Sequence, residues 1–426
     1  MGTRSLRAWP ASCPRVALFP NMLLSKVLHH WAFNSFAKDV PKAVDEAKSR
    51  HILFCTTCPE AWGGSEELWA GAARRLVTQG YRVTAHLSHL ELTHPEVINL
   101  IESGVRIDRY RGVPLLSRFR GLRLRWERPL TVARLQSTKP KLAVISQGEN
   151  MDGYRKILYC RLASIPYVLI CQKAMEDNWP MDYDRGWLKE WFGEARCVYF
   201  VSEHNRVVTE QCIGKKLTNA EVVHNPFKVN YHTELPWPDL AQGRFRLACV
   251  ARLWMRDKAQ DILVKILAQE KWRQREIEVN FYGSGHNAVG LKELIEMLGV
   301  TNARICGFSR DVTEIWRQNH ALILPSRHEG LPLALTEAML CGRTAITTNV
   351  GGNAEVLEDE QTGFLARAVT VEAVEDAMER AWNRRHEWQK IGLNAAKRIR
   401  SLIPEDPCSI FTEKLTAIYR EVVGSS

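Results

Sequence analysis

Short apolar runs alternate with segments of helical spacing over most of the chain. The runs are rich in Val, Ile, Leu and Phe, and in the segments between them apolar residues recur every three or four positions. Continuous apolar strands are typical of parallel sheets that are covered on both faces. The pattern predicts strands at 51–55, 81–87, 142–146, 167–171, 197–202, 245–251, 277–283, 303–307, 321–325, 344–348 and 363–366, and helices over 65–79, 95–102, 259–269 and 291–297.

A proline-containing stretch at 235–238 interrupts this rhythm, which then starts again. We therefore predict two doubly wound Rossmann-like lobes with a cleft between them, over residues 51–235 and 236–403. Residues 404–426 end in a stripe of apolar positions and are predicted to form a helix that packs back across the lobes. Residues 1–50 contain prolines and no strand pattern, which predicts a disordered or dispensable basic extension.

The amino-acid composition excludes several classes of protein. The 426 residues are 45% hydrophobic and 25% charged, which excludes a chain that is disordered throughout. No apolar run is long enough to span a membrane, and the eleven cysteines are mostly scattered, so we expect a cytoplasmic protein with reduced thiols. Cys55-x-x-Cys58 has no second Cys or His pair at zinc spacing, so neither a metal nor a redox function is inferred from it.

The loop and helix after the predicted strand 321–325 carry the most informative chemistry. Pro332 stands where a helix begins, so the backbone N–H groups near Gly330 and Leu331 are expected to face the cleft. Glu329 lies at the mouth of this helix and Glu337 two turns inside it. A carboxylate there can accept hydrogen bonds from the two vicinal hydroxyls of a ribose, whereas the alternative interpretation is two solvated helical glutamates.

Two cations and a glycine loop are further candidates for contact with a ligand. Arg252 and Lys258 follow the strand 245–251, where they can hold a diphosphate and neutralise the charge of a departing phosphate. Gly63 and Gly64 lie between the first strand and a helix and permit the backbone to approach a ligand closely. Solvated cations and an ordinary tight turn are the alternatives.

Taken in order, these motifs resemble those of the retaining nucleotide-sugar glycosyltransferases of the GT-B architecture, specifically glycosyltransferase family 4. The resemblance covers about residues 51–423 and is strongest over 247–366. Its ordered motifs are the Gly-Gly-Ser-Glu loop, Val222 to Pro226, Arg252 with Lys258, Tyr282 to Gly285, Glu329 with Glu337, Gly351-Gly352-x-x-Glu355 and Thr362 to Phe364.

The resemblance implies a role for each matching residue. It implies catalytic roles for Glu329, which touches the donor sugar, and for Arg252 and Lys258, which hold its diphosphate. It implies that donor binding involves Gly63, Gly64, Gly283, Gly285, Gly330, Leu331 and Glu337, with Gly64 at the phosphate and Glu337 at the ribose. Contact with the acceptor or sugar is expected from Gln172, Lys173 and Asn225. The family uses no bound metal and no cofactor beyond its nucleoside-diphosphate sugar.

One departure from the family pattern concerns the acceptor. Many members have a histidine after the strand that corresponds to 167–171, whereas this chain has Gln172. Gln172 can bind a hydroxyl but cannot carry a proton, so the leaving phosphate would take the acceptor proton or the acceptor would differ. The resulting hypothesis is transfer of a sugar, with retention, to a glycan or lipid-linked acceptor in cell-envelope or exopolysaccharide synthesis. The alternative is an inactive relative that binds sugar nucleotides as a regulator or scaffold.

The formal charge of +10 calls for an anionic partner. Residues 1–50 carry eight basic against three acidic residues, and a second basic segment runs from Arg106 to Arg128 with apolar residues interleaved. Arginines can meet lipid headgroups while apolar residues enter the interface. A peripheral position at the inner face of a membrane is therefore expected, whereas nucleic-acid binding through the same segment is the less favoured alternative.

We predict that the Arg106–Arg128 segment binds anionic vesicles, at about 1 kcal/mol per basic residue near the surface. Co-sedimentation with phosphatidylglycerol vesicles should be strong at low salt and weaken as salt rises, and replacing Arg118, Arg120, Arg123 and Arg125 by Ser should abolish it. Equal binding to neutral vesicles, or none to either kind, contradicts the prediction. Salt-sensitive retention on DNA or RNA would favour the nucleic-acid alternative.

Overall fold

The fold was analysed in a computed structural model that describes residues 50–60, 62–108, 130–240 and 243–425. Arg50–Ser426 forms one compact unit. Residues 1–49 of the predicted basic extension and residues 109–128 of the arginine-rich segment lie outside the described residues. The expectations for those two stretches stay predictions.

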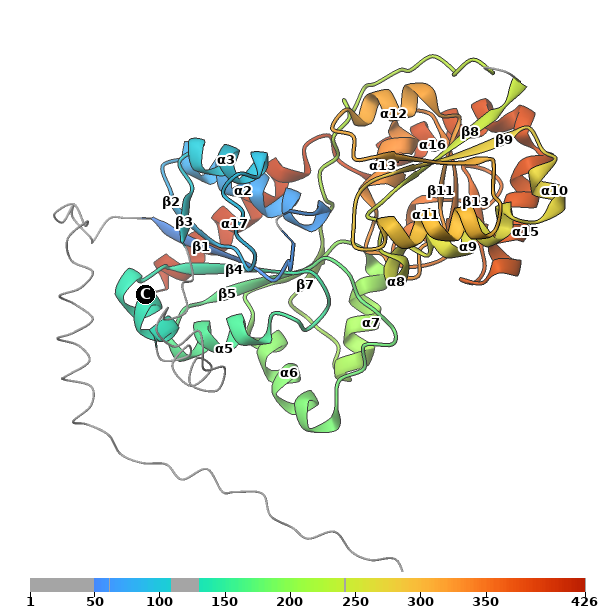
Figure 1. The fold of residues 1–426 in the computed structure, drawn as a ribbon. Coiled ribbons are helices and arrows are strands. Elements are labelled where there is room, and N and C mark those ends of the chain that lie inside the picture. The colour runs from blue at the N-terminus through green and yellow to red at the C-terminus, as the bar shows by residue number, and fades with distance from the viewer. Residues whose placement is uncertain (1–49, 61, 109–129, 241–242, 426) are drawn as a thin grey trace, which may run out of the picture. The chain divides into compact units, whose positions relative to one another are not determined.

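The N-terminal lobe is built on a parallel sheet with the order β3-β2-β1-β4-β5-β6-β7 (Figure 1). Its strands are β1 His51–Thr56, β2 Arg82–His86, β3 Arg106–Asp108, β4 Leu142–Gln147, β5 Tyr167–Cys171, β6 Val198–Phe200 and β7 Ala220–Val222. Successive residues of β1 enter opposite cores, Ile52 and Phe54 on one face and Leu53 and Cys55 on the other. Burial of both faces explains the uninterrupted apolar run.

Helices cover the two faces of this sheet. They are the 3-10 turn η3 Gly64–Glu66, α2 Glu67–Thr78, α3 Pro95–Glu102, α5 Tyr154–Leu162, α6 Asp182–Glu194 and α7 Glu203–Ile213. Local chemistry sets several of their ends: the Ser202 hydroxyl accepts a hydrogen bond from the Asn205 N–H at the start of α7, and Gly214 ends it with a positive φ of 67°.

The C-terminal lobe is also built on a parallel sheet, with the order β10-β9-β8-β11-β12-β13. Its strands are β8 Phe245–Val250, β9 Ile277–Tyr282, β10 Ala303–Gly307, β11 Ala321–Leu324, β12 Thr344–Thr348 and β13 Phe364–Ala366. Its helices are α8 Met255–Lys258, α9 Gln260–Leu267, α10 Glu270–Arg273, α11 Ala288–Met297, α12 Val312–Gln318, α13 Leu333–Leu340, α14 Asn353–Val356, α15 Val371–Asn383, the 3-10 turn η6 Arg385–Glu387 and α16 Trp388–Leu402.

The predicted fold class is confirmed, and the differences are local. The sequence pattern missed the short strands β3 and β7, as well as several helices, among them α5, α7, α12, α15 and α16. β3 and β7 are edge strands of three residues, partly exposed, so they lack the continuous apolar run of a central strand. The helix expected over 259–269 is α9, and Lys258, which was expected between strand and helix, ends the separate one-turn helix α8.

The last helix, α17 Pro407–Gly424, belongs to the core of the N-terminal lobe. Phe411, Leu415 and Tyr419 lie in the same buried cluster as strands β1 and β2, and α17 packs along α2. Phe411 is fully buried with its ring edge-on to Tyr199. The apolar stripe seen in the sequence is therefore buried in the core of the N-terminal lobe.

We predict that Phe411→Ala destabilises the N-terminal lobe by about 3–5 kcal/mol, because it removes a fully buried ring and leaves a cavity. Urea unfolding followed by tryptophan fluorescence measures this loss. The matched control is Glu413→Ala on the exposed side of the same helix, which should stay within about 0.5 kcal/mol of wild type. Equal stability of the two variants would contradict the packing of α17.

Candidate active site

Loops after the strands of the C-terminal lobe bring the predicted phosphate-binding residues to one edge of its sheet. Arg252 follows β8, and the Leu253 N–H donates to the Ser284 carbonyl after β9. Gly283 has a φ of 144°, and a Cβ added there would lie 2.0 Å from the Ala251 carbonyl oxygen. A Cβ at Gly285 would lie 2.5 Å from the Leu253 carbonyl oxygen. The two predicted donor-binding glycines thus hold the Arg252 loop by direct backbone contact.

Lys258 and Glu329 form a buried ion pair. The Lys258 Nζ lies 2.6 Å from the Glu329 Oε1, and the exposed fractions of their side chains are 17% and 6%. Ala259 follows Lys258 with a positive φ of 50°, so the chain turns sharply between α8 and α9. The turn separates Lys258 from α9 and leaves its ammonium beside the predicted sugar-binding carboxylate.

The neighbouring residue Asp257 makes a second pair with the N-terminal lobe. Its Oδ2 lies 2.9 Å from the Nζ of Lys173, and its backbone carbonyl accepts from the Arg327 N–H at 2.7 Å. Burial raises the pKa of Asp257, but the hydrogen bond and charge of Lys173 outweigh it and hold that pKa below its usual range. Lys173, expected to contact acceptor or sugar, is therefore paired with Asp257 here.

Gln172, Asn225 and Gly330 lie together. The Asn225 Nδ2 donates to the Gln172 Oε1 at 2.8 Å, and a Cβ at Gly330 would lie 2.0 Å from the Gln172 carbonyl oxygen. Within the part of the chain that the structure describes, the buried Gln172 Nε2 and Asn225 Oδ1 have no hydrogen-bond partner. Buried polar atoms usually have a partner, so one donor and one acceptor remain for a ligand.

Glu337 lies in the second turn of α13, fully buried, where sequence spacing placed it two turns inside. Its Oε1 accepts a hydrogen bond from the backbone N–H of Lys228 at 3.0 Å. The Lys228 Nζ lies 2.7 Å from the Glu67 Oε1 of α2. Burial raises the pKa of Glu337 from 4.5 to about 7. Its surroundings thus favour the neutral acid when no ligand donates to it.

The glycine loop of the N-terminal lobe faces the start of α13. A Cβ at Gly64 would lie 3.1 Å from the Leu333 Cδ1, whereas Gly63 has more room, with its nearest neighbours at 3.7 Å or more. The buried Glu66 carboxyl group holds this loop, because it accepts hydrogen bonds from the Thr56 hydroxyl and the Trp69 indole N–H. Burial raises the pKa of Glu66 to about 7.

Arg252 is held by acidic residues of both lobes. Its Nη1 forms an ion pair with Glu60, and its Nη2 lies 4.0 Å from the Asp257 Oδ2. Arg252 and Lys258 therefore lie at one edge of the sheet, as expected, and each contacts a carboxylate.

Sequence reasoning missed Asp257, Lys228 and Glu67, which position the predicted residues. It named Glu355 as part of a motif without a role. The Glu355 carboxylate accepts hydrogen bonds from the backbone N–H groups of Glu203 and His204, at 3.1 and 2.7 Å, at the start of α7. These contacts join positions far apart in the chain, so no local spacing signals them.

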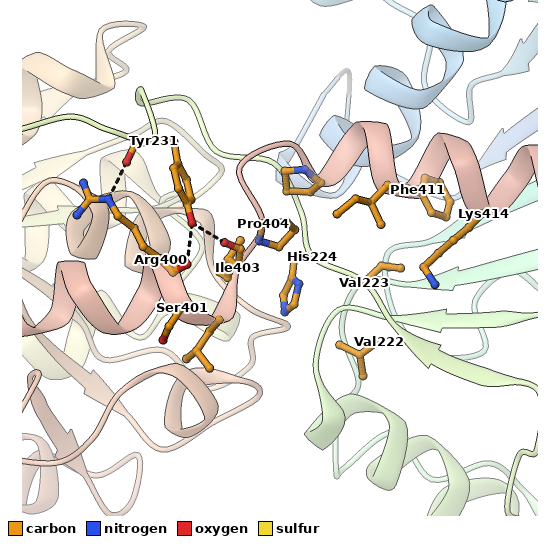
Figure 2. Close-up of a pocket in the computed structure, with 13 residues that line it drawn as sticks. Val222, Val223, His224, Tyr231, Arg400, Ser401, Ile403, Pro404, Phe411 and Lys414 are labelled. Carbon is orange, nitrogen blue, oxygen red and sulfur yellow. Dashed lines mark hydrogen bonds between the residues drawn. The ribbon is translucent and has the colours of Figure 1, made fainter.

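A cavity of about 440 Å³ lies where the chain passes between the lobes near Tyr231 and Pro404 (Figure 2). Arg400 closes one side, and the Tyr231 hydroxyl donates to the Arg400 and Ile403 carbonyls at 2.7 and 3.0 Å. None of the predicted site residues lines this cavity. It therefore stands apart from the candidate active site, although His224 in its wall adjoins Asn225.

The comparison with protein families identifies the C-terminal lobe. Residues 244–384 match the model of the family described as Glycosyl transferases group 1. The match covers most of the C-terminal lobe and about a third of the whole chain. The matched range contains Arg252, Lys258, Glu329 and Glu337, which are four of the residues whose geometry is described above.

Curated relatives match parts of the chain. An Escherichia coli UDP-Gal:alpha-D-GlcNAc-diphosphoundecaprenol alpha-1,3-galactosyltransferase is 32% identical over 76 residues, which is 18% of this chain and 20% of that protein. The putative glycosyltransferase EpsD of Bacillus subtilis is 27% identical over 143 residues, 33% of this chain and 37% of that protein. The chain thus matches well under half the length of these two relatives.

Solved structures share the fold over nearly the whole described chain. HepE from Anabaena, crystallised with UDP-glucose, has a TM-score of 0.69 at 17% identity and covers 86% of this chain and 99% of its own. Sucrose-phosphate synthase from Thermosynechococcus elongatus has a TM-score of 0.69 at 17% identity, with 88% and 100% covered. The architecture is therefore GT-B.

In the part of the chain that the structure describes, none of the helices has the length and apolar character of a membrane span.

We predict that Glu337 makes the stability of this domain fall as pH rises. Because the folded pKa is about 7 and the ordinary value is 4.5, its contribution is complete below pH 4.5 and is lost as pH rises through 7. Glu337→Gln keeps a neutral acceptor, so its melting temperature relative to wild type should increase between about pH 5 and pH 8. Glu293→Gln, at an exposed position of α11, controls for the substitution; a difference that is constant with pH contradicts the prediction.

Proposed function

We propose that this protein is a glycosyltransferase that moves a sugar from a nucleoside-diphosphate sugar to a glycan or lipid-linked acceptor, with retention at the anomeric carbon and without a metal. The observation that carries the proposal is the buried Lys258–Glu329 pair beside the contact of Gly330 with Gln172. A cation, a carboxylate and two amide groups lie there, and one atom of each amide has no hydrogen-bond partner among the described residues.

The donor diphosphate is proposed to bind between Arg252 and Lys258. Both side chains already contact carboxylates. In the proposed complex a phosphate would replace Glu60 as the partner of Arg252, and a phosphate would bind Lys258 together with Glu329. Negative charge grows on the diphosphate as the sugar departs, and two fixed cations stabilise that charge more than the ground state. This is the role that a divalent metal has in other transferases, so metal-independent transfer is part of the proposal.

The ribose is assigned to Glu337 and the sugar to the group formed by Glu329, Gln172 and Asn225. The Glu337 Oε1 accepts from Lys228, which leaves Oε2 to accept from a ribose hydroxyl. The free Gln172 Nε2 and Asn225 Oδ1 supply one donor and one acceptor, which suits a sugar hydroxyl that both accepts and donates. Gln172 positions a hydroxyl and carries no proton, so the departing phosphate takes the acceptor proton.

The comparisons supply the first substrates to try. Structural neighbours were crystallised with UDP and UDP-glucose, and the Escherichia coli relative is named for a UDP-galactose donor and a diphosphoundecaprenol-linked acceptor. We extend these chemistries to this chain as UDP-sugars and lipid-linked glycans of the cell envelope. Action at the inner face of a membrane belongs to the same proposal and rests on the arginine-rich segment.

The test measures donor binding and donor turnover separately. Thermal shift with UDP-, GDP-, ADP- and dTDP-sugars identifies the donor, and slow hydrolysis of that donor reports turnover. We predict that Glu337→Ala weakens donor binding by about 1–3 kcal/mol, because a charged hydrogen bond is lost. Lys258→Met should depress kcat with a smaller effect on binding, because the charge that it meets grows in the transition state.

Lys292→Met on the exposed face of α11 is the matched control and should leave both quantities unchanged. Circular dichroism confirms that each variant folds, and EDTA should leave hydrolysis unaffected. Wild-type binding without hydrolysis or transfer would instead establish a sugar-nucleotide-binding regulator. Unchanged kinetics in both site variants would overturn the residue assignments.

A further inference from the structure

Three polar side chains lie in a row across β1, β2 and β3 at the carboxyl edge of the N-terminal sheet. The parallel register pairs Cys55 with His86 and His86 with Asp108, so the three side chains share one face. The Cys55 Sγ lies 4.0 Å from the His86 Nδ1, and the His86 Nε2 lies 3.0 Å from the Asp108 Oδ2. A thiol, an imidazole and a carboxylate therefore contact one another in that order.

The carboxylate keeps the imidazole charged. Burial by itself lowers the pKa of His86, but hydrogen bonds with Asp108 and Cys55 outweigh it and raise that pKa to about 9. Arg134 forms an ion pair with the other oxygen of Asp108 and so holds the carboxylate in place. The charged imidazole lies 4.0 Å from the Cys55 sulfur, where it can stabilise negative charge that develops on that sulfur during attack.

A small cavity lies next to this row. Its volume is about 40 Å³, and its lining includes Cys55, His86, Lys156 and a second thiol, Cys160. One water needs about 10–15 Å³ measured in this way, whereas pockets for organic substrates are about 300 Å³ or more. The cavity therefore admits a molecule of the size of hydrogen peroxide and is too small for a peptide, an ester or a sugar.

We propose that Cys55 is a peroxide-reactive thiol and that Cys160 is its resolving partner. In the first step the Cys55 sulfur attacks one oxygen of hydrogen peroxide, the O–O bond breaks, and sulfenic acid and water form. In the second step the Cys160 sulfur attacks the oxidised sulfur, a Cys55–Cys160 disulfide forms, and the hydroxyl leaves with the Cys160 proton as water. The two thiols lose two electrons and peroxide gains them.

The position of Cys58 makes the choice of partner testable. Cys55-x-x-Cys58 is the spacing of many dithiols, yet Cys160 lines the cavity with Cys55 and Cys58 is not among its lining residues. Cys58 lies in the loop after β1, where its backbone N–H donates to the Thr56 hydroxyl. The two thiols that line the cavity therefore belong to β1 and α5, and the proposed disulfide would join these two elements.

The test is peptide mapping of the full chain after treatment with hydrogen peroxide at a few equivalents. Remaining thiols are alkylated under denaturing conditions, and the fragments are identified by mass spectrometry in a Cys306→Ser background, which removes an exposed thiol. We expect a Cys55–Cys160 disulfide, while the buried Cys212 and Cys249 stay reduced. Cys160→Ser should instead accumulate Cys55 as sulfenic and then sulfinic acid.

The contribution of His86 is tested by its isosteric amide. His86→Gln keeps a hydrogen bond to Asp108 and removes the charge, so oxidation of Cys55 should slow by about tenfold or more. Asp108→Asn should slow it in the same direction, and thermal unfolding confirms that both variants fold. An unmodified Cys55 under these conditions, or an unchanged rate in both variants, overturns the reactive thiol. A Cys55–Cys58 disulfide overturns the assignment of Cys160.

Discussion

The parallel direction of every strand is the constraint on which the candidate site depends. When all strands of a sheet run the same way, the loops that follow them gather at one edge, and ligands of such folds bind there. Arg252 follows β8 and Glu329 follows β11, so two neighbouring strands deliver a cation and a carboxylate to the same place. In the N-terminal lobe the same rule places Gly64 after β1 and Gln172 after β5.

The loops of the candidate site pack closely against one another, backbone against backbone. A Cβ at Gly330 would overlap the Gln172 carbonyl, and a Cβ at Gly351 would lie 2.4 Å from the Glu329 carbonyl oxygen. The Gly352 N–H donates to the Gly330 carbonyl at 2.6 Å. Glycine is required here because chains approach one another, so substitution would shift the loop that carries Glu329. Rigid placement of charged groups is what electrostatic stabilisation of a leaving group needs, because little reorganisation remains to be done.

Buried charges around the site are arranged in compensated pairs. Taking a charge out of water is costly unless an opposite charge and hydrogen bonds replace the solvent. Lys258 meets Glu329, and Asp257 meets Lys173. Glu337 accepts a hydrogen bond from the Lys228 backbone N–H, and burial raises its pKa to about 7, so its charge is less well compensated than that of these pairs. The candidate site therefore combines charges that are already paired with a carboxyl group, Glu337, whose pKa is raised by burial.

The amino-acid sequence by itself determined the two parallel α/β lobes, because a strand buried on both faces must be apolar at nearly every position, as in His51–Thr56 and Ala321–Leu324. It also predicted the residues at the ends of these strands, since local spacing places Arg252 and Glu329 there. Only the tertiary structure decided that Lys258 pairs with Glu329, that Lys173 is taken by Asp257, and that Cys55, His86 and Asp108 form one row. These contacts join residues 22 to 84 positions apart, and strand order and register, rather than local spacing, bring such residues together.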